Sequence, residues 1–230
     1  MKVGIIGAME QEVELLRDML EQPTAKVIAG CELIEGTIDG TDVVLVKSGI
    51  GKVNAALATT LLLNEFQPDV VLNTGSAGGF GEGLTVGTVV ISDDVLHHDV
   101  DATVFGYDLG QVPQMPARYA SDERLIDVAK EAVDAIGKHP YAVGLIASGD
   151  VFMSDPERVA LVRSQFPEMI ASEMEAAAVA QVCHQFDVPF VVIRALSDIA
   201  GVQSNISFDE FLPLAAKHST EIVLHVLSKL

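Results

Sequence analysis

Acidic side chains stand at three points where apolar runs of the sequence meet polar ones. Glu12 follows the run VGIIGAM, Glu175 lies in SEME before an alanine-rich stretch, and Asp198 closes the run FVVIRALSD. In sheets covered by helices, ligands bind where strands end, so these carboxylates are candidates for one site. An ionised carboxylate can accept two hydroxyl hydrogen bonds, which suits it to a vicinal diol. The simpler interpretation of Glu12 and Glu175 is an acid in the first turn of a helix.

Asp198 carries the strongest chemical signal of the three. A carboxyl group at the end of a buried strand has few structural roles beyond capping the next segment of the chain. Burial without a nearby cation disfavours the charged form and raises the pKa of a carboxyl group, which is what a general acid near neutral pH requires. We therefore expect Asp198 to donate a proton to a substrate, and the adjacent Ser197 is a candidate substrate-binding residue.

Two glycine-rich segments could let the backbone approach a ligand closely. Residues 74–80 (TGSAGGF) follow an apolar run, and glycines there allow backbone amides to turn towards a ligand. A tight turn without a ligand is the alternative for this segment. Residues 48–52 (SGIGK) suggest a phosphate loop, but Val53 stands where a Walker loop has Ser or Thr. Neither segment matches the dinucleotide pattern GxGxxG.

Histidines and acids at residues 97–101 (HHDVD) offer metal-ligand chemistry. In an extended chain His97, Asp99 and Asp101 face one way and His98 faces the other. Because no second group of ligands accompanies them, the sequence favours a structural or interface role over a metal site. Neither a metal nor a cofactor is expected.

Short β-branched runs alternate with helical patterns along the whole chain. Strands are predicted at 2–7, 43–47, 70–73, 88–92, 143–147 and 190–195, and helices at 11–20, 53–66, 124–136, 156–166, 174–186 and 209–230. Most of the strands are apolar throughout, as a sheet requires when helices cover both of its faces. The predicted class is α/β. No linker, low-complexity tract or repeat divides the chain, so residues 1–230 are predicted to form a single domain.

The charge balance limits the classes of partner. Lys and Arg number 14 against 33 Asp and Glu, which gives a net charge of −19. Binding to nucleic acid or to an anionic membrane needs clustered cations, so neither partner is expected. With 49% hydrophobic residues, the chain is too apolar for a disordered acidic protein.

The sequence also predicts a cytoplasmic location. No uncharged stretch approaches the about 20 residues that a membrane-spanning helix needs. The N-terminal segment MKVGIIGAMEQE lacks the apolar core and cleavage site of a signal peptide. The two cysteines, Cys31 and Cys183, lie far apart and have no CxxC partner, which argues against a disulfide framework or a structural zinc site.

Five motifs, in this order, closely resemble those of the 5′-methylthioadenosine/S-adenosylhomocysteine nucleosidase family: GIIGAMEQE, KSGIGKVNAA, NTGSAGG, SEMEAAAVA and RALSD. The similarity covers nearly the whole chain, as far as FDEFL at residues 208–212. Each motif alone is weak evidence for the family, but five motifs in the same order are specific to it. The resemblance implies a nucleoside phosphorylase-like fold, with three α/β/α layers around a twisted mixed sheet. It also implies hydrolysis of the N-glycosidic bond of both nucleosides, and of 5′-deoxyadenosine, with release of adenine.

The resemblance further implies a role for each matching position. Asp198 would protonate purine N7, Glu12 would activate the attacking water, and Glu175 would bind the ribose hydroxyls. The Met153 backbone would contact the adenine edge, and Phe152 would stack on the base. The remaining implied residues are Ser76, Gly78 and Arg194 on the water and ribose side, and Met9, Ile50, Met174 and Phe208 around the 5′-thio group.

In relatives, the loop that matches residues 98–105 reaches into the active site of the neighbouring subunit. Ala102, Phe105 and Pro113 are therefore expected to complete the pocket of a partner chain in a homodimer. The apolar character of residues 102–116 (ATVFGYDLGQVPQMP) supports association, because such a loop usually packs on something. Two positions depart from the family pattern: Ala102 is smaller than the branched residue expected there, and Ser172 replaces a more apolar residue.

Three other functions stay open at this point. A purine nucleoside phosphorylase would need converging cations for phosphate. Only Arg194 stands at a predicted strand end, with Lys47 and Lys52 as further candidates. An aminodeoxyfutalosine hydrolase would differ at the 5′ substituent alone. A protein of the same fold that only binds or stores nucleosides would be expected to lack one of the three carboxylates.

Overall fold

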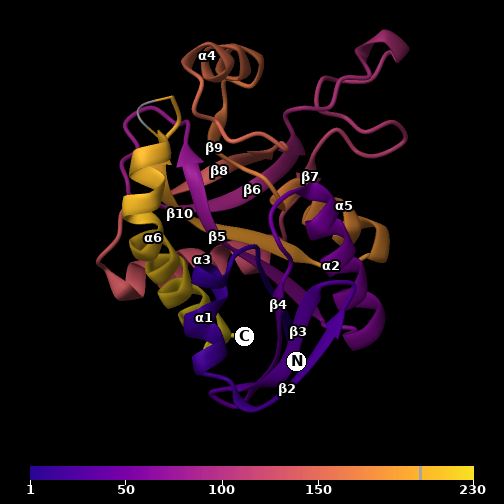
Figure 1. Cartoon of the computed structure of the whole chain (residues 1–230), viewed down its shortest axis with the longest axis vertical. Coiled ribbons are helices and arrows are strands. Elements are labelled where there is room, and N and C mark those ends of the chain that lie inside the picture. Colours follow the sequence, from indigo (N-terminus) through magenta and orange to yellow (C-terminus); the bar gives the residue numbers. More distant parts are fainter. Residues whose placement is uncertain (202–203) are drawn as a thin grey trace.

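The computed structural model describes residues 1–201 and 204–230, with side chains at all of these positions except 204–207. Single strands or short runs of strands alternate with helices along the chain (Figure 1). Their bounds are β1 (Lys2–Gly7), α1 (Glu10–Asp18), β2 (Glu21–Ile28), β3 (Cys31–Ile38), β4 (Thr41–Lys47), α2 (Lys52–Phe66), β5 (Val70–Gly79), β6 (Val89–His97), η1 (Thr103–Phe105), β7 (Tyr119–Ala120), α3 (Glu123–Ile136), β8 (Tyr141–Ser148), α4 (Pro156–Gln165), β9 (Met169–Glu173), α5 (Ala176–Phe186), β10 (Phe190–Ile199) and α6 (Ser204–Leu227).

All of these strands belong to one mixed sheet. Its order is β10-β6-β8-β9-β5-β1-β4-β3-β2, with β7 paired to β6. The pairs β1–β4, β1–β5, β5–β10, β6–β8 and β8–β9 are parallel, and the others are antiparallel. Because β5 pairs with both β9 and β10, the strands β5, β9, β8, β6 and β10 form a closed ring. The predicted mixed sheet is confirmed.

Helices cover both faces of the sheet, so the predicted three-layer α/β/α arrangement is also confirmed. Helices α1, α3 and α6 pack on one face and α2 and α5 on the other (Figure 1). Each face has its own apolar cluster: Val13, Leu16 and Val223 belong to the first, and Leu62 and Val179 to the second. This double coverage explains why the central strands are apolar throughout. Within the described ranges, no helix has the length and apolarity that crossing a membrane requires.

The strand predicted at 70–73 is longer than expected, because most of the glycine-rich segment 74–80 continues it rather than forming a turn. Strand β5 continues from Val70 through the glycines to Gly79, and β10 continues to Ile199. The two strands stay paired to their ends, where Asp198 faces Gly78. Strands on both sides supply hydrogen-bond partners for the backbone, and this tertiary pairing outweighs the weak strand preference of glycine.

Four strands were not predicted: β2, β3, β7 and β9. Strand β2 is exposed along nearly all of its length, contains Pro23 and lacks an apolar face, which is typical of an edge strand. Strand β9 occupies the residues that precede the alanine-rich helix, and that helix begins at Ala176 rather than at the predicted 174. The last helix, predicted over 209–230, spans Ser204–Leu227.

Candidate functional site

Segments from distant parts of the chain meet around one cavity of about 290 Å³. The start of α1, the β4–α2 loop, the second half of β5, the segment that joins β9 to α5, and the end of β10 all contribute. Its lining residues are Ala8, Met9, Glu12, Ile50, Ser76, Ala77, Gly78, Phe152, Ser172, Glu173, Met174, Glu175, Arg194, Ser197, Asp198 and Phe208. The three carboxylates that the sequence singled out therefore lie in one cavity.

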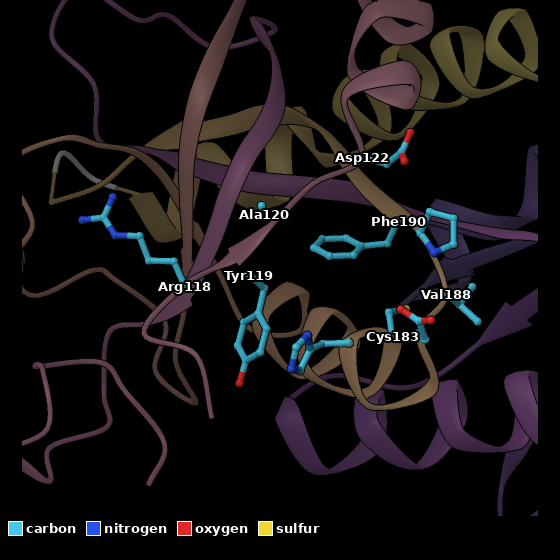
Figure 2. Close-up of a pocket in the computed structure, with 10 residues that line it drawn as sticks. Arg118, Tyr119, Ala120, Asp122, Cys183, Val188 and Phe190 are labelled. Atoms are coloured by element: carbon cyan, nitrogen blue, oxygen red, sulfur yellow. The ribbon is translucent and has the colours of Figure 1, made fainter. Parts of the chain in front are cut away.

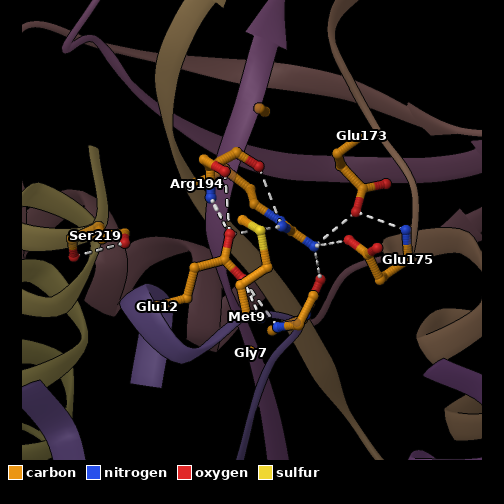
Figure 3. A network of polar contacts seen from close by, with 12 residues as sticks. Gly7, Met9, Glu12, Glu173, Glu175, Arg194 and Ser219 are labelled. Carbon is orange, nitrogen blue, oxygen red and sulfur yellow. Dashed lines mark hydrogen bonds and ion pairs between the residues drawn. The ribbon is translucent and has the colours of Figure 1, made fainter. Parts of the chain in front are cut away.

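Arg194 stands at the centre of the polar side of this cavity, with its side chain 1% exposed. Its Nη2 lies 2.6 Å from Oε2 of Glu173 and 3.4 Å from Oε2 of Glu175, and it donates to Oδ1 of Asn73 over 2.9 Å (Figure 3). Its Nη1 lies 4.0 Å from Oε1 of Glu12. A buried charge needs such compensation. Because three carboxylates surround one guanidinium, the cluster is net negative when all are ionised.

Glu12 is held by four hydrogen bonds. Its Oε2 accepts from the amides of Ala8 and Met9 at 2.9 and 3.1 Å. Its Oε1 accepts from the Ser76 amide at 2.9 Å and from the Ser76 hydroxyl at 3.0 Å. Gly75 allows this approach, because a Cβ at that position would lie 2.4 Å from Oε1 of Glu12. Glu12 therefore both caps its own helix and faces the cavity. The two interpretations of Glu12, as an acid of the first helical turn and as a site residue, both apply.

Glu173 fixes the chain where β9 gives way to α5. Its Oε2 accepts hydrogen bonds from the amides of Glu175 and Ala176 at 2.9 and 2.8 Å, and its Oε1 accepts one from the Ser148 hydroxyl. The same carboxylate is paired with Arg194. The sequence shows Glu173 and Glu175 as a pair of acids before a helix and assigns no separate role to Glu173, whereas in the structure Glu173 orients both the backbone of Glu175 and the guanidinium.

Glu175 is buried, and it occupies the N-cap position of α5. Its Oε1 accepts a hydrogen bond of 2.8 Å from the Gly51 amide. Burial and the neighbouring charge of Glu173 raise the pKa of Glu175 to about 8, against the opposing effect of Arg194. A carboxylate in this position readily takes up a proton unless further hydrogen-bond donors stabilise the ionised form.

Asp198 has no cation beside it among the described residues. Its side chain is buried, and its Oδ1 accepts a hydrogen bond of 2.9 Å from the Ser197 hydroxyl. Burial raises the pKa of Asp198 to about 6, although the Ser197 hydroxyl acts in the opposite direction. The expected environment of a general acid is therefore present.

The loop between β4 and α2 is held in place by a ring of charged residues. The Lys52 amide donates to Oδ1 of Asp150 over 2.8 Å, and Nζ of Lys52 lies 2.5 Å from Oδ1 of Asp99. The Asp150 amide closes the ring by donating to Oδ2 of Asp99 over 2.9 Å. The Gly51 amide donates its hydrogen bond to the Glu175 carboxylate. The glycine-rich segment 48–52 therefore binds a carboxylate of the protein itself, in agreement with the absence of a Walker motif.

Apolar side chains close the other side of the cavity. Met9, Ile50, Phe152, Met174 and Phe208 all line it. The rings of Phe152 and Phe208 meet edge to face, with their centroids 5.5 Å apart. Ile50 and Phe152 are 50% and 41% exposed, so this wall also forms the mouth of the cavity. The cavity therefore offers acids on one side and an apolar surface on the other.

The cavity contains almost all of the binding residues expected within one chain. Met153 lies just outside it and lines an adjoining cavity of about 30 Å³. Ala102, Phe105 and Pro113, expected to serve a partner chain, do not line the cavity of their own chain. Sequence reasoning gave no role to Ala8 and Ala77, which have no polar side chain, and it noted Ser172 only as a departure from the family pattern.

The histidine-rich segment does not form a metal site in the described part of the chain. Nε2 of His97 lies 3.0 Å from Oε1 of Gln181, and burial lowers the pKa of His97 and of His98. Asp99 faces Lys52, and Asp101 accepts hydrogen bonds from Thr103. No group of three or more His, Cys, Asp or Glu residues in the described ranges is placed to hold a metal ion.

A second cavity, of about 330 Å³, lies between β7, the end of α5 and the start of β10 (Figure 2). It is lined by Arg118, Tyr119, Ala120, Asp122, Cys183, His184, Asp187, Val188, Pro189 and Phe190. Neither the buried carboxylates nor Arg194 belong to it. The first cavity, where those groups converge, is therefore the candidate active site.

Comparison with known proteins gives one consistent result. A family profile described as "Phosphorylase superfamily" matches residues 2–228. The 5′-methylthioadenosine/S-adenosylhomocysteine nucleosidase of Lysinibacillus sphaericus is 67% identical over 230 residues, which cover 100% of both chains.

Two solved structures extend this result to three dimensions. The nucleosidase of Neisseria meningitidis in complex with methylthio-immucillin-A has a TM-score of 0.98 at 53% identity, with 100% of this chain and 99% of that chain covered. The nucleosidase of Colwellia psychrerythraea in complex with adenine has a TM-score of 0.98 at 50% identity, with 100% and 96% covered.

Proposed function

The chain belongs to the 5′-methylthioadenosine/S-adenosylhomocysteine nucleosidase family of the phosphorylase superfamily, and we propose that it hydrolyses the N-glycosidic bond of these two nucleosides. The products are adenine and a 5-substituted ribose. The observation that carries the proposal is the buried Asp198, without a cation beside it among the described residues, in a cavity whose other acids surround Arg194.

Asp198 is the general acid in this proposal. Cleavage of the bond leaves negative charge on the departing adenine, and a proton delivered to N7 neutralises it. Because the pKa of Asp198 is about 6, a fraction of the protein molecules carries a protonated Asp198 near neutral pH. The Ser197 hydroxyl donates to Oδ1 of Asp198 and holds the side chain in place.

Glu12 activates the attacking water. A carboxylate offers about four lone-pair positions, and Glu12 already accepts four hydrogen bonds. The Ser76 hydroxyl is the donor that can rotate away, so the water takes its place at Oε1 of Glu12. The two backbone amides at Oε2 keep the carboxylate in position while the proton moves.

Glu175 binds the ribose hydroxyls, and the acids around the sugar stabilise the transition state. Positive charge develops on the ribose as the bond breaks, and the net negative cluster around Arg194 favours that charge. Arg194 lies 3.4 Å from Glu175 and 4.0 Å from Glu12, so it holds both acids without neutralising the whole cluster.

The base and the 5′ substituent occupy the apolar part of the cavity. Phe152 stacks on adenine, and the backbone of Met153 contacts its polar edge. Gly78 leaves room for the base beside Asp198, since a Cβ there would lie 3.2 Å from Oδ2 of that residue. Met9, Ile50, Met174 and Phe208 surround the 5′-thio group, which suits an uncharged thioether.

Water is favoured over phosphate as the nucleophile because the available cations are already engaged. Arg194 pairs with Glu173 and Glu175, Lys52 with Asp99, and Lys47 with Glu10. Phosphate would need several converging cations. The purine nucleoside phosphorylase alternative therefore has little support.

The direct test is adenine release from 5′-methylthioadenosine and S-adenosylhomocysteine by the purified protein, with and without phosphate. We expect equal rates in both buffers and a free sugar as the second product. Strict dependence on phosphate, with a sugar phosphate formed, would show a phosphorylase. Binding of the nucleosides without any adenine release would show a nucleoside-binding protein. Relative rates on 5′-deoxyadenosine and aminodeoxyfutalosine would define the 5′ preference.

We further propose that the active form is a homodimer, in which Ala102, Phe105 and Pro113 complete the pocket of the partner chain. The exposure of Val104 and Phe105, at 84% and 79%, supports this proposal because such apolar side chains usually pack on another surface. Sedimentation across a dilution series tests it. Monomers with full activity would contradict the proposal.

The proposed location is the cytoplasm, with neither nucleic acid nor membrane as a partner. The net charge of −19 and the two buried free cysteines support this proposal. Retention of the protein on anionic lipid vesicles or on DNA at physiological salt would contradict it.

A further inference from the structure

Ser172 on β9 carries a buried hydroxyl group that no described residue satisfies. The residue is 5% exposed, and its Oγ has no hydrogen-bond partner within the described part of the chain. An unpaired buried hydroxyl destabilises the folded protein, so most buried polar atoms have a partner. Because Ser172 lines the cavity, rotation about its Cα–Cβ bond can turn the hydroxyl towards a bound molecule, which would then be the missing partner.

The register of the sheet places Ser172 across from the proposed general acid. Gly78 of β5 pairs with Ser172 on one side and with Asp198 on the other. Residues paired across neighbouring strands present their side chains on the same face of the sheet. Since Gly78 has no side chain, a gap separates Ser172 from Asp198, and both residues line the cavity that fills it.

The adjoining small cavity links the same residue to the adenine side of the site. This cavity, of about 30 Å³, is lined by Gly78, Val151, Phe152, Met153, Ser172, Glu173, Met174 and Asp198. It therefore includes the two residues assigned to the base, Phe152 and Met153, together with the acid assigned to N7. Among the residues that line this small cavity, Ser172 is the one that carries a hydroxyl group.

We propose that the Ser172 hydroxyl forms a hydrogen bond with the polar edge of the purine base, across the Gly78 gap from Asp198. The inference rests on the proposed function, in which adenine occupies this part of the cavity. Adenine offers ring nitrogens as acceptors and a 6-amino group as a donor, and a hydroxyl can serve either. Adenine would supply the hydrogen-bond partner that no described residue provides for Ser172.

Two other hydroxyls provide matched comparisons. Thr220 on α6 is also buried and has an Oγ1 without a partner among the described residues, but it does not line the cavity. Ser219 is buried and satisfied, because its hydroxyl donates to the carbonyl oxygen of Ala216 over 3.1 Å. Ser172 differs from Thr220 because it lines the cavity, and it differs from Ser219 because its hydroxyl has no partner among the described residues.

Calorimetric titration with adenine and thermal unfolding together test the proposal. We expect Ser172→Ala to bind adenine about three- to tenfold more weakly, the range for one lost neutral hydrogen bond. The same variant should melt about 2–4 °C higher in the absence of ligand, because an unpaired hydroxyl has been removed. Thr220→Val should also melt higher but bind adenine like the wild type, and Ser219→Ala should melt lower with unchanged binding.

Ser172→Ala is expected to lower the affinity for adenine and to raise the melting temperature. These opposite effects distinguish a ligand contact from a structural role. A Ser172→Ala protein that binds adenine within twofold of the wild type, or that loses affinity together with melting temperature, would overturn the proposal. The isosteric Ser172→Cys provides a second variant and should also bind more weakly. Failure of the wild type to bind adenine would instead contradict the proposed function itself.

Purine, which lacks the 6-amino group, identifies the atom concerned. Equal penalties for adenine and purine in Ser172→Ala would assign the bond to a ring nitrogen. A penalty for adenine alone would assign it to the amino group.

Discussion

The Gly51 amide donates a hydrogen bond of 2.8 Å to Oε1 of Glu175, although the two residues lie 124 positions apart in the chain. This bond and Arg194 both favour the ionised form of Glu175, against burial and the charge of Glu173. Gly51 has a φ of +95°, and a Cβ there would lie 3.1 Å from Oδ1 of Asp150. The donor thus depends on a glycine in the left-handed region and on the residues that hold its loop.

The first prediction concerns the ring formed by Lys52, Asp99 and Asp150. Asp150→Ala removes the acceptor of the Lys52 amide, so the loop should relax and the Gly51 amide should leave Glu175. We expect kcat/KM for 5′-methylthioadenosine to fall about tenfold, the effect of one lost hydrogen bond to a charged group. The affinity for adenine alone, measured by calorimetry, should change much less because Glu175 serves the ribose.

Two further variants control this experiment. Asp150→Asn keeps an oxygen acceptor for the Lys52 amide and should retain most of the activity. Lys130→Met breaks an exposed ion pair with Asp127 on α3, which does not line the cavity, and should have no effect. Wild-type kinetics in Asp150→Ala would show that the ring does not position the loop.

The second prediction concerns the two catalytic acids. Asp198→Asn and Glu12→Gln should each lower the rate of adenine release by about 10²- to 10⁴-fold, the usual contribution of a general acid or base. Both substitutions preserve shape, so circular dichroism should be unchanged. Asp127→Asn, at an exposed position of α3, is the matched control. A near wild-type rate in either variant would refute the assigned roles.

The third prediction concerns stability and pH. The folded-state pKa of Asp198 lies above its usual value of 3.8, at about 6, so folding favours the protonated form. The contribution of Asp198 to the free energy of unfolding should therefore fall as pH rises from about 4 to 6 and stay lower above that range. Asp198→Asn, which cannot ionise, should be more stable than the wild type at pH 8, by up to about 3 kcal/mol.

Urea unfolding at pH 8 and at pH 4 measures this difference. The advantage of Asp198→Asn should be large at pH 8 and nearly absent at pH 4, where both side chains are neutral. A constant difference at the two pH values would mean that Asp198 does not titrate in this range.

The fourth prediction concerns Gly75. Its φ is +142°, and a Cβ would lie 2.4 Å from Oε1 of Glu12 and 2.8 Å from Nη1 of Arg194. Gly75→Ala should displace Glu12 and lower kcat at least about a hundredfold, similar to loss of the base. Gly30→Ala is the control, since Gly30 has a φ of +83° but no heavy atom within 4 Å of the added Cβ. Gly30→Ala should cost some stability and leave kcat unchanged.

The sequence predicts the parts of the fold that have a strong apolar pattern. β1 matches the predicted bounds of 2–7, and the prediction of helix 53–66 differs from α2 by one residue. The hairpin of β2 and β3 escaped prediction because β2 is polar, exposed and at the edge of the sheet. Its stability comes from pairing with neighbouring strands, which no local pattern records.

The site shows the same division between local and long-range information. Glu12, Glu175 and Asp198 stand at chain positions where an unusual residue type is visible, and five ordered motifs placed them in a family. The roles of Glu173 and of Lys52, Asp99 and Asp150 depend on contacts between distant segments. Such contacts carry no signal at any single position of one sequence.

The closed ring of β5, β9, β8, β6 and β10 determines how the site should fail on heating. Every strand of the ring is paired with two others in it, so none can detach without breaking hydrogen bonds along both of its sides. Arg194, Asp198, Ser172 and Glu173 all stand on these strands, whereas β2 at the open edge can fray alone. Amide hydrogens of the ring should exchange only through global unfolding, and those of β2 through local opening. Thermal inactivation should therefore coincide with the cooperative loss of the whole fold instead of preceding it.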